Sequence, residues 1–245
     1  MTTYPINFIS KVIARVDFQP ILKLKQEPVD FQEIIREQFP RFSQKESIDI
    51  SIKPGEVPVP TKIPTWQFTS KEKTDQISLN YQMIALTMKK YVNFESFFLK
   101  VELMYNTFNN IYHPSIIKRI GLRFINEIKL KGNPLDWDGI INNNLYCIIN
   151  AFPDLSTSLK RAMSQLHISL EDHSIIFQFG IFNSEYPNII TQREFILDYD
   201  CASKDESEPE GVLSTFRLYY EDIKKVFKQC RGEKLLRIMK EETML

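Results

Sequence analysis

The strongest constraint on the fold of this chain is a sequence pattern that occurs twice. The run Lys11-Val12-Ile13-Ala14-Arg15-Val16 is matched by the run Arg119-Ile120-Gly121-Leu122-Arg123-Phe124, and each leads to a Phe-Pro pair. The matching arginines are 108 positions apart (123 − 15), and the Phe-Pro pairs, at positions 39 and 152, are 113 apart (152 − 39). A repeat of about half the chain predicts two equivalent units and excludes a solenoid of many short repeats.

Both runs have the period of a half-buried β-strand. In the first run, Val12, Ala14 and Val16 alternate with more polar residues, and the second run has the same alternation. Successive side chains of a strand point to opposite faces of the sheet. We therefore predict strands over residues 8–18 and 116–130, with Arg15 and Arg123 on the face that points away from the core.

Helical periodicity is clearest in the middle of the chain. Apolar residues recur at intervals of three and four between Asn93, a good N-cap residue, and Pro114. A helix beginning at the capping box of Asp30 and ending at Phe39-Pro40 is expected in the first half. In the second half, Asp136 is expected to begin a helix that ends at Phe152-Pro153, and a further helix spans residues 216–230 before a terminal turn.

The remaining segments alternate like strands of an antiparallel meander. Four prolines between positions 54 and 64 predict an extended loop. Further strands are expected at residues 48–52, 66–68, 76–88 (as two strands with a turn at position 80), 163–170, 174–182 and 194–201.

Each half thus reads as strand, helix, about three strands and long helix. The predicted fold class is α+β, with repeats at residues 1–115 and 116–245 joined in one compact pseudo-two-fold unit. The two repeats are expected to share one antiparallel sheet with both long helices on one face. This arrangement resembles TATA-binding-protein-like and helix-grip-like saddles, whose other face is a groove, although a fold does not determine a function. The apolar stripes predict core positions at Phe97, Val101, Phe108, Leu145, Ile148, Tyr220 and Phe227.

Composition restricts the kinds of partner. The 31 basic residues balance the 31 acidic ones, so there is no overall field to attract nucleic acid or an anionic membrane. Seven glycines against 18 phenylalanines argue against glycine-rich phosphate loops and for an aromatic interior. No apolar run is long enough for a membrane span or a signal peptide, which predicts a cytoplasmic protein. No cofactor is predicted.

The cysteines and histidines have no spacing typical of a site. Cys147, Cys201 and Cys230 are odd in number and lack C-x-x-C spacing, which predicts reduced thiols in the core. The histidines, at positions 113, 167 and 173, show no metal-ligand spacing, and we expect surface roles for them.

The candidate binding residues are charged side chains on the polar strand faces. If the first strands of the two halves lie near the pseudo-axis, Arg15 and Arg123, with Arg119, could bind a carboxylate, a phosphate or an acidic partner. The alternative is neutralisation within the chain by Asp17, Glu127 or an acid of a neighbouring strand. Either reading places these arginines on one surface.

Two aspartates have the spacing of a metal-binding pair. Asp198 and Asp200 project to one strand face, as the carboxylates of a metal-dependent phosphodiesterase would. Such a site needs at least one more acid or histidine, and pairing with Arg15 or Arg123 is the simpler interpretation. No catalytic or metal residue is therefore assigned.

Several motifs resemble a known group of proteins. The strand from Val12 to Phe18, the Trp66-Gln67-Phe68 segment and the run from Lys118 to Asn126 are similar to an uncharacterised, sporadically distributed prokaryotic family of about this length. The resemblance extends to the run from Phe195 to Asp200. It implies an accessory or interaction role, such as mobile or defence-associated genes have, and it carries over no established activity.

The first hypothesis is therefore a cytoplasmic interaction or regulatory protein. It would bind another protein, encoded nearby, through the sheet groove or the proline-rich loop. The alternative is a binder of a small anionic ligand or nucleic acid on the face lined by Arg15 and Arg123. A metal-dependent phosphodiesterase or nuclease is the third hypothesis.

Overall fold

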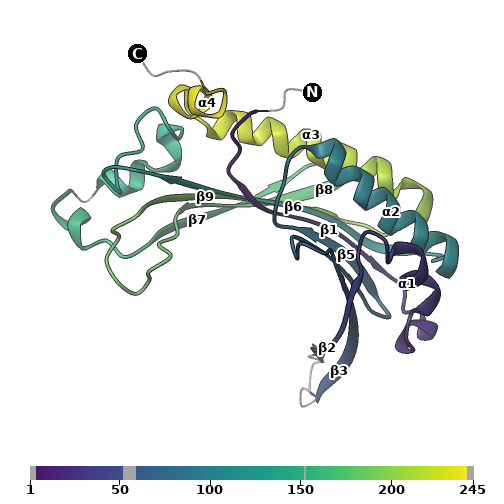
Figure 1. Ribbon diagram of the computed structural model, residues 1–245. Helices are drawn as coiled ribbons and strands as arrows, with labels where there is room; N and C mark the ends of the chain where they lie inside the picture. The colour runs from purple at the N-terminus through teal and green to yellow at the C-terminus, as the bar shows by residue number, and fades with distance from the viewer. Residues whose placement is uncertain (1–3, 52–58, 152, 242–245) are drawn as a thin grey trace.

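A single antiparallel sheet of nine strands organises the molecule, and the α+β prediction is confirmed (Figure 1). The computed structural model describes residues 4–51, 59–151 and 153–241. The strands occur in the order β2-β3-β4-β5-β1-β6-β9-β8-β7. Their bounds are β1 Ile9–Phe18, β2 Arg41–Ser51, β3 Val59–Thr69, β4 Asp75–Leu79, β5 Met83–Met88, β6 Ile117–Leu130, β7 Ala162–Ser169, β8 His173–Ile181 and β9 Arg193–Ser203.

The two strands that carry the repeated run lie side by side at the centre of the sheet. Strands β1 and β6 pair antiparallel, with Ala14 opposite Leu122 and Arg15 opposite Gly121. Strand β5 pairs with the other edge of β1, and β9 pairs with the other edge of β6. Each central strand therefore has the last strand of its own half as its second neighbour.

Four α-helices cover one side of this curved sheet (Figure 1). Their bounds are α1 Val29–Ile35, α2 Phe94–Tyr112, α3 Val212–Cys230 and α4 Glu233–Met239. Helix α2 begins as predicted, because the Asn93 side chain accepts a hydrogen bond from the Ser96 N–H. The opposite, concave side of the central strands carries no α-helix in the part of the chain that the structure describes.

The core lies between the helices and the sheet. Val12, Ala14 and Val16 are completely buried, and they alternate with residues of the concave face as the sequence predicts. The Phe108 ring of α2 packs 4.6 Å from the Phe18 ring, centroid to centroid. The predicted core positions Phe97, Val101 and Phe108 are buried, while Tyr220 and Phe227 are partly buried.

The helix predicted from Asp136 is wrong. The segment contains three short 3₁₀ turns, η2 Asn143–Leu145, η3 Cys147–Ala151 and η4 Pro153–Ser158. Gly139 has a positive φ, and the Asn142 side chain caps Asn144, so both residues favour turns over a continuous helix. As a consequence Ile148 is 59% exposed, Leu145 is only partly buried, and Cys147 is exposed rather than in the core. Phe152, the expected helix end, lies outside the described residues.

Three smaller predictions also need correction. Helix α1 begins at Val29, so Asp30 lies in its first turn and does not cap it. The proline-rich segment is partly a strand, because β3 includes Pro60 and Pro64, and residues 52–58 lie outside the described part. Strand β4 pairs with β3 only from Trp66 onward. One edge of β3 near these prolines therefore forms no ladder with β4, and the N–H donor that proline lacks is not needed there.

His173 is buried rather than on the surface. Its ring packs against Tyr219, and its Nε2 atom lies 3.2 Å from Asp222 Oδ2 of α3. Gly232 ends α3 as predicted, but the residues after it form the short helix α4 and not a turn, while β7, β8 and β9 lie where the alternation indicates them.

Truncation of Phe108 to Ala should lower the free energy of unfolding by about 3–5 kcal/mol, because the side chain is fully buried. Urea denaturation followed by circular dichroism measures this change. Leu99→Ala on the same helix is the control, because Leu99 is 65% exposed and its loss should cost less than about 0.5 kcal/mol. Equal costs for the two variants would show that the helix-to-sheet packing is assigned incorrectly.

Candidate functional site

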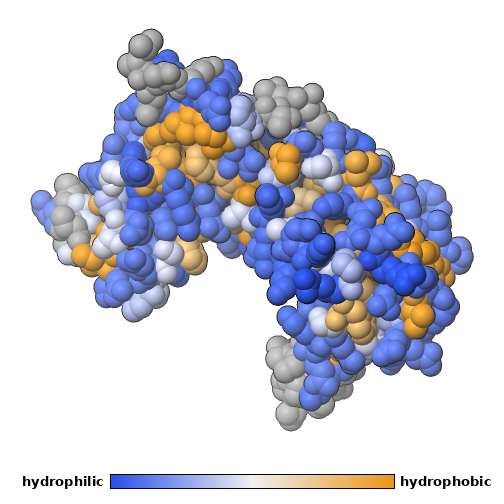
Figure 2. All heavy atoms as spheres, in the orientation of Figure 1, coloured by the Kyte–Doolittle hydropathy of each residue, from blue (hydrophilic) through white to orange (hydrophobic). Residues whose placement is uncertain are grey.

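The concave face of the sheet is hollowed, as the space-filling view shows from the side (Figure 2). Two cavities of about 580 Å³ and about 360 Å³ lie on this face, and Arg123 lines both. We call the surface lined by these two cavities the charged groove. It extends from the central strands β1 and β6 to the edge strand β7.

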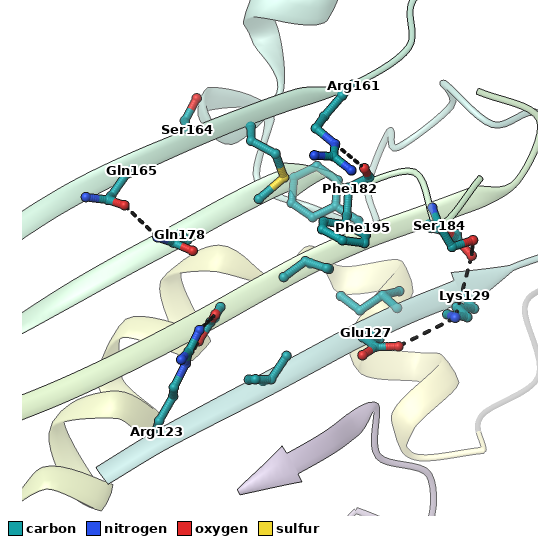
Figure 3. A pocket seen from close by; sticks show the side chains of 16 residues that line it. Arg123, Glu127, Lys129, Arg161, Ser164, Gln165, Gln178, Phe182, Ser184 and Phe195 are labelled. Carbon is teal, nitrogen blue, oxygen red and sulfur yellow. Dashed lines mark hydrogen bonds and ion pairs between the residues drawn. The ribbon is translucent and has the colours of Figure 1, made fainter. Parts of the chain in front are cut away.

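The alternation of the strands explains why polar side chains gather there. Odd positions from Lys11 to Asp17 of β1 and from Arg119 to Lys129 of β6, and even positions of β9, point to the concave face, because the residues between them are buried under the helices. Across the sheet, Ile125 of β6 lies opposite Asp198 of β9, which lies opposite Gln178 of β8. In the next strand the Gln165 amide oxygen accepts a hydrogen bond of 2.6 Å from Gln178 (Figure 3).

At the centre of the groove, two arginines and two aspartates form one network. Arg15 Nε donates to Asp17 Oδ1 at 2.8 Å, and the Arg119 guanidinium lies 3.8 Å from Asp17 and 3.5 Å from Asp200. Gly121 makes this possible, because a Cβ atom there would lie 2.7 Å from an Arg119 guanidinium nitrogen. The missing side chain lets Arg119 lie across β6 between the two carboxylates.

The tightest ion pair of the groove joins Arg123 to Asp198. Arg123 donates two hydrogen bonds, of 2.8 and 2.6 Å, to the two carboxylate oxygens. Asp198 is only 6% exposed, whereas the Arg123 side chain is 39% exposed. The hydrogen bonds to Asp198 raise the pKa of Arg123, so this guanidinium stays charged. A fork-to-fork geometry of this kind is the strongest arrangement for an arginine and a carboxylate.

The outer end of the groove contains a second buried acid, Glu194. Its carboxylate accepts 2.9 Å hydrogen bonds from both the backbone N–H and the hydroxyl of Ser184, and Lys129 lies 3.5 Å away (Figure 3). Burial alone would raise the pKa of Glu194, but the Ser184 donors and the Lys129 charge outweigh it and lower that pKa. Arg161 lies over the Phe182 ring at the same end, 4.6 Å from its centroid.

Asp200 is the least well compensated carboxylate of the groove. Burial and, to a lesser degree, the neighbouring Asp198 charge raise the pKa of Asp200, although Arg119 and Arg123 oppose this effect. The charge of Asp200 is therefore destabilised relative to an aspartate in water. A cation from outside the chain would find here a partly exposed acceptor.

The structure brings all five predicted site residues together on one face. Arg15, Arg119 and Arg123 each face a carboxylate of the chain, which is the internal pairing considered above. Asp198 and Asp200 do not form a metal centre with a third group, because among the residues that the structure describes no cluster of three or more metal-ligating side chains occurs. Whether the five residues bind a partner or an ion stays a prediction.

Sequence reasoning missed the outer half of the groove. Arg161 and Ser184 lie just outside β7 and β8, where no periodicity places a side chain, and Phe182 ends the predicted strand 174–182, whose pattern does not mark it as a site residue. Their position follows from the pairing of β7, β8 and β9, so only the strand order could have located them. The alternation within β9 did place Glu194 on the same face as Asp198.

Replacement of Arg123 by Ala should destabilise the fold by about 1–3 kcal/mol, because it leaves the buried Asp198 carboxylate without its donors. Arg15→Ala is the matched variant and should cost less than about 1 kcal/mol, because the Arg15 side chain is 47% exposed. Urea denaturation measures both. An Arg123→Ala protein as stable as the Arg15→Ala protein would show that the Asp198 pair is not structural.

The Ser184→Ala variant should be less stable than the unmodified chain at neutral pH by about 1 kcal/mol, because it loses a hydroxyl donor to ionised Glu194. A lowered folded pKa stabilises the native state above the unfolded pKa, and this stability is lost as the pH falls through the folded pKa. The difference between the two proteins should therefore vanish in acid, as denaturation at several pH values can measure. Ser164→Ala, in the same groove, should show no such pH dependence.

Comparison of the chain with protein-family models, with curated proteins and with solved structures finds no match. Within the described residues no helix has the length and apolar character needed to cross a membrane. Function has to be argued from the groove itself.

Proposed function

We propose that the protein binds an extended segment of another protein in the charged groove. The observation that carries this proposal is the balance of charge along the groove. Its larger cavity has three cations, Arg123, Lys129 and Arg161, and three anions, Glu127, Glu194 and Asp198. A polyanion such as nucleic acid would be repelled by the acids as much as it is attracted by the bases, whereas a polypeptide can present both charges.

Apolar side chains of the groove add a second reason. Met163 and Phe182 are 39% and 41% exposed, and they line the same cavity as the ion pairs. Exposed apolar groups surrounded by polar ones are typical of protein interaction surfaces. The ion pairs would select and orient the partner, and burial of the apolar groups would supply most of the affinity.

The edge strand β7 supports an extended partner. It is the outermost strand beside the groove, and its eight residues include no Asp, Glu, Lys or Arg, although His167 lies among them. The opposite edge strand, β2, carries Arg41, Lys45 and Glu46. Charged side chains usually protect an edge strand from pairing with other chains. The edge of β7, which lacks lysine, arginine and carboxylate side chains, is therefore suited to the addition of a partner strand.

We also propose that the two halves are equivalent units related by a pseudo-two-fold axis, as in a saddle. The repeat offset of 108 takes Ala14 to Leu122, and these two residues face each other at the centre of the sheet. An axis through this pair would exchange Arg15 with Arg123. The groove would then have arisen by duplication of one unit. Its polar face, to which both halves contribute, would serve the expected accessory role in the cytoplasm.

The partner should contact Asp200 with a basic side chain, since Asp200 is the least compensated acid. A random-peptide library selected on the immobilised protein should enrich segments with both basic and apolar residues. Replacement of Asp200 by Asn should weaken the selected peptides about tenfold in fluorescence anisotropy, the loss of one charge-assisted hydrogen bond. The free energy of unfolding of the Asp200→Asn protein should not fall, because ionised Asp200 is itself unfavourable in the fold.

One control variant and one further groove variant complete this experiment. Asp138→Asn changes an exposed aspartate that pairs with Lys234 outside the groove, and it should leave peptide affinity unchanged. Met163→Glu should weaken the same peptides by placing a charge among the apolar contacts. Unchanged affinity in both groove variants would refute the proposal, and so would an oligonucleotide that displaces the selected peptides at physiological salt.

A further inference from the structure

A second pocket lies on the other, helix-covered side of the sheet. Its volume is about 310 Å³, at the lower end of the range for small-molecule sites. The floor is formed by β6 and β9, and the walls by the start of α2, by α3 and by the segment before β1. Since this pocket shares no residue with the charged groove, it is independent of the proposed function. We call it the aromatic pocket.

Aromatic rings form a large part of its wall and fix its shape. Tyr220 of α3 stacks on Phe94 of α2 with ring centroids 3.8 Å apart and an interplanar angle of 7°. Phe124 of the floor lies 5.9 Å from Tyr220 and 5.6 Å from Tyr91. Rings held in this way offer flat faces and edges to a guest, which favours a planar molecule.

The wall is electrically neutral. Burial, and then the nearby Tyr220 hydroxyl, raises the pKa of Tyr91, so both tyrosines stay protonated. Of the two charged residues at the pocket, Lys224 pairs with Glu221 at 2.6 Å and Glu95 lies 3.6 Å from Arg217. An ionic guest would find no free counter-charge and would lose its hydration.

One polar side chain of the floor is only partly satisfied. Asn126 interrupts the buried stripe that includes Phe124 and Ile128, and it is 6% exposed. Its amide N–H donates to the Leu197 carbonyl at 3.3 Å, while its own carbonyl oxygen accepts no hydrogen bond from the described residues. This oxygen is not fully enclosed and faces the pocket, so a guest that donates to it would replace water with a direct hydrogen bond.

The backbone beside Asn126 is irregular at the same point. Ile9 of β1 pairs with Asn126, but Lys11 pairs with Ile125, so Ser10 is an extra residue in β1. This β-bulge directs Ser10 to the concave face, where its hydroxyl donates to Glu127 at 2.9 Å. Bulges occur often next to binding sites, because they change the direction of side chains. Here the bulge lets Ile9 line the aromatic pocket.

We infer that the aromatic pocket binds a small, uncharged, planar aromatic molecule that donates one hydrogen bond to the Asn126 carbonyl oxygen. Contact with the outer faces and edges of the tyrosine and phenylalanine rings would hold the ring system. The Asn126 acceptor would set its orientation and discriminate between molecules of the same shape. Charged metabolites and long aliphatic chains do not fit this combination of aromatic rings and charged side chains that are already paired.

A pair of probes with one shape tests the inference. Indole carries a ring N–H donor, and indene has the same fused rings without it. In titrations followed by isoleucine-methyl NMR, indole should bind about two- to tenfold more tightly than indene, the value of one neutral hydrogen bond. The methyls of Ile9 and Ile223, which line the pocket, should shift, and those of Ile13 and Ile125 in the groove should not.

The variant Asn126→Leu separates recognition from shape. It should bind both probes with equal affinity, because the acceptor is lost while the ring walls remain. Equal binding of indole and indene by the unmodified protein would overturn the inference, as would shifts confined to the groove methyls or no shift at all. These outcomes need no variant, so the test stands even if Asn126→Leu does not fold.

Discussion

The pairing of β1 with β6 is the constraint on which the rest of the structure depends. Because side chains alternate along a strand, a slip of one residue would move Arg15 and Arg123 into the helix-covered core and expose Val12 and Ala14. The cost of burying unpaired guanidinium groups excludes that alternative. The observed register, with Ala14 opposite Leu122, therefore decides which face of the sheet is apolar and which is charged. This pair also decides which face the side chains of the neighbouring strands point to, since β5 and β9 pair with its two outer edges.

The two faces consequently have different physical characters. On the helix side, aromatic side chains pack between the sheet and the helices. The aromatic pocket lies where Asn126 interrupts the buried apolar stripe of β6. On the concave side, acids and bases alternate and satisfy one another without any covering layer. The two proposed sites lie on opposite faces of the sheet. The aromatic pocket would hold its ligand by ring stacking and the charged groove by charge and strand pairing, so the two ligands need not be related.

Much of this fold could be predicted from local patterns. Strands β1 and β6 alternate regularly, and α2 has a regular apolar spacing. In each case the local pattern agrees with the structure that forms. The segment after β6 failed because Gly139 and the asparagines at positions 142 to 144 favour turns, although its apolar spacing is helical. The site was predictable as a face, and pairing of Asp198 and Asp200 with Arg15 or Arg123 was expected, but the individual partners were not predictable. That Arg123 binds Asp198 follows from the adjacency of β6 and β9, which neither segment reveals alone.

If the charged groove binds a partner as proposed, its internal ion pairs account for both the stability of the free protein and its selectivity. A groove of unpaired arginines would gain affinity for any anion and would repel itself in the free state. Internal pairing removes that repulsion, but it also means that a partner gains little from charge unless it replaces an existing pair or meets an under-compensated group. Asp200 is such a group, whereas Asp198 is already saturated by Arg123. In the proposed function, selectivity would rest on Asp200, a single acid between ion pairs, and burial of the exposed Met163 and Phe182 would drive association.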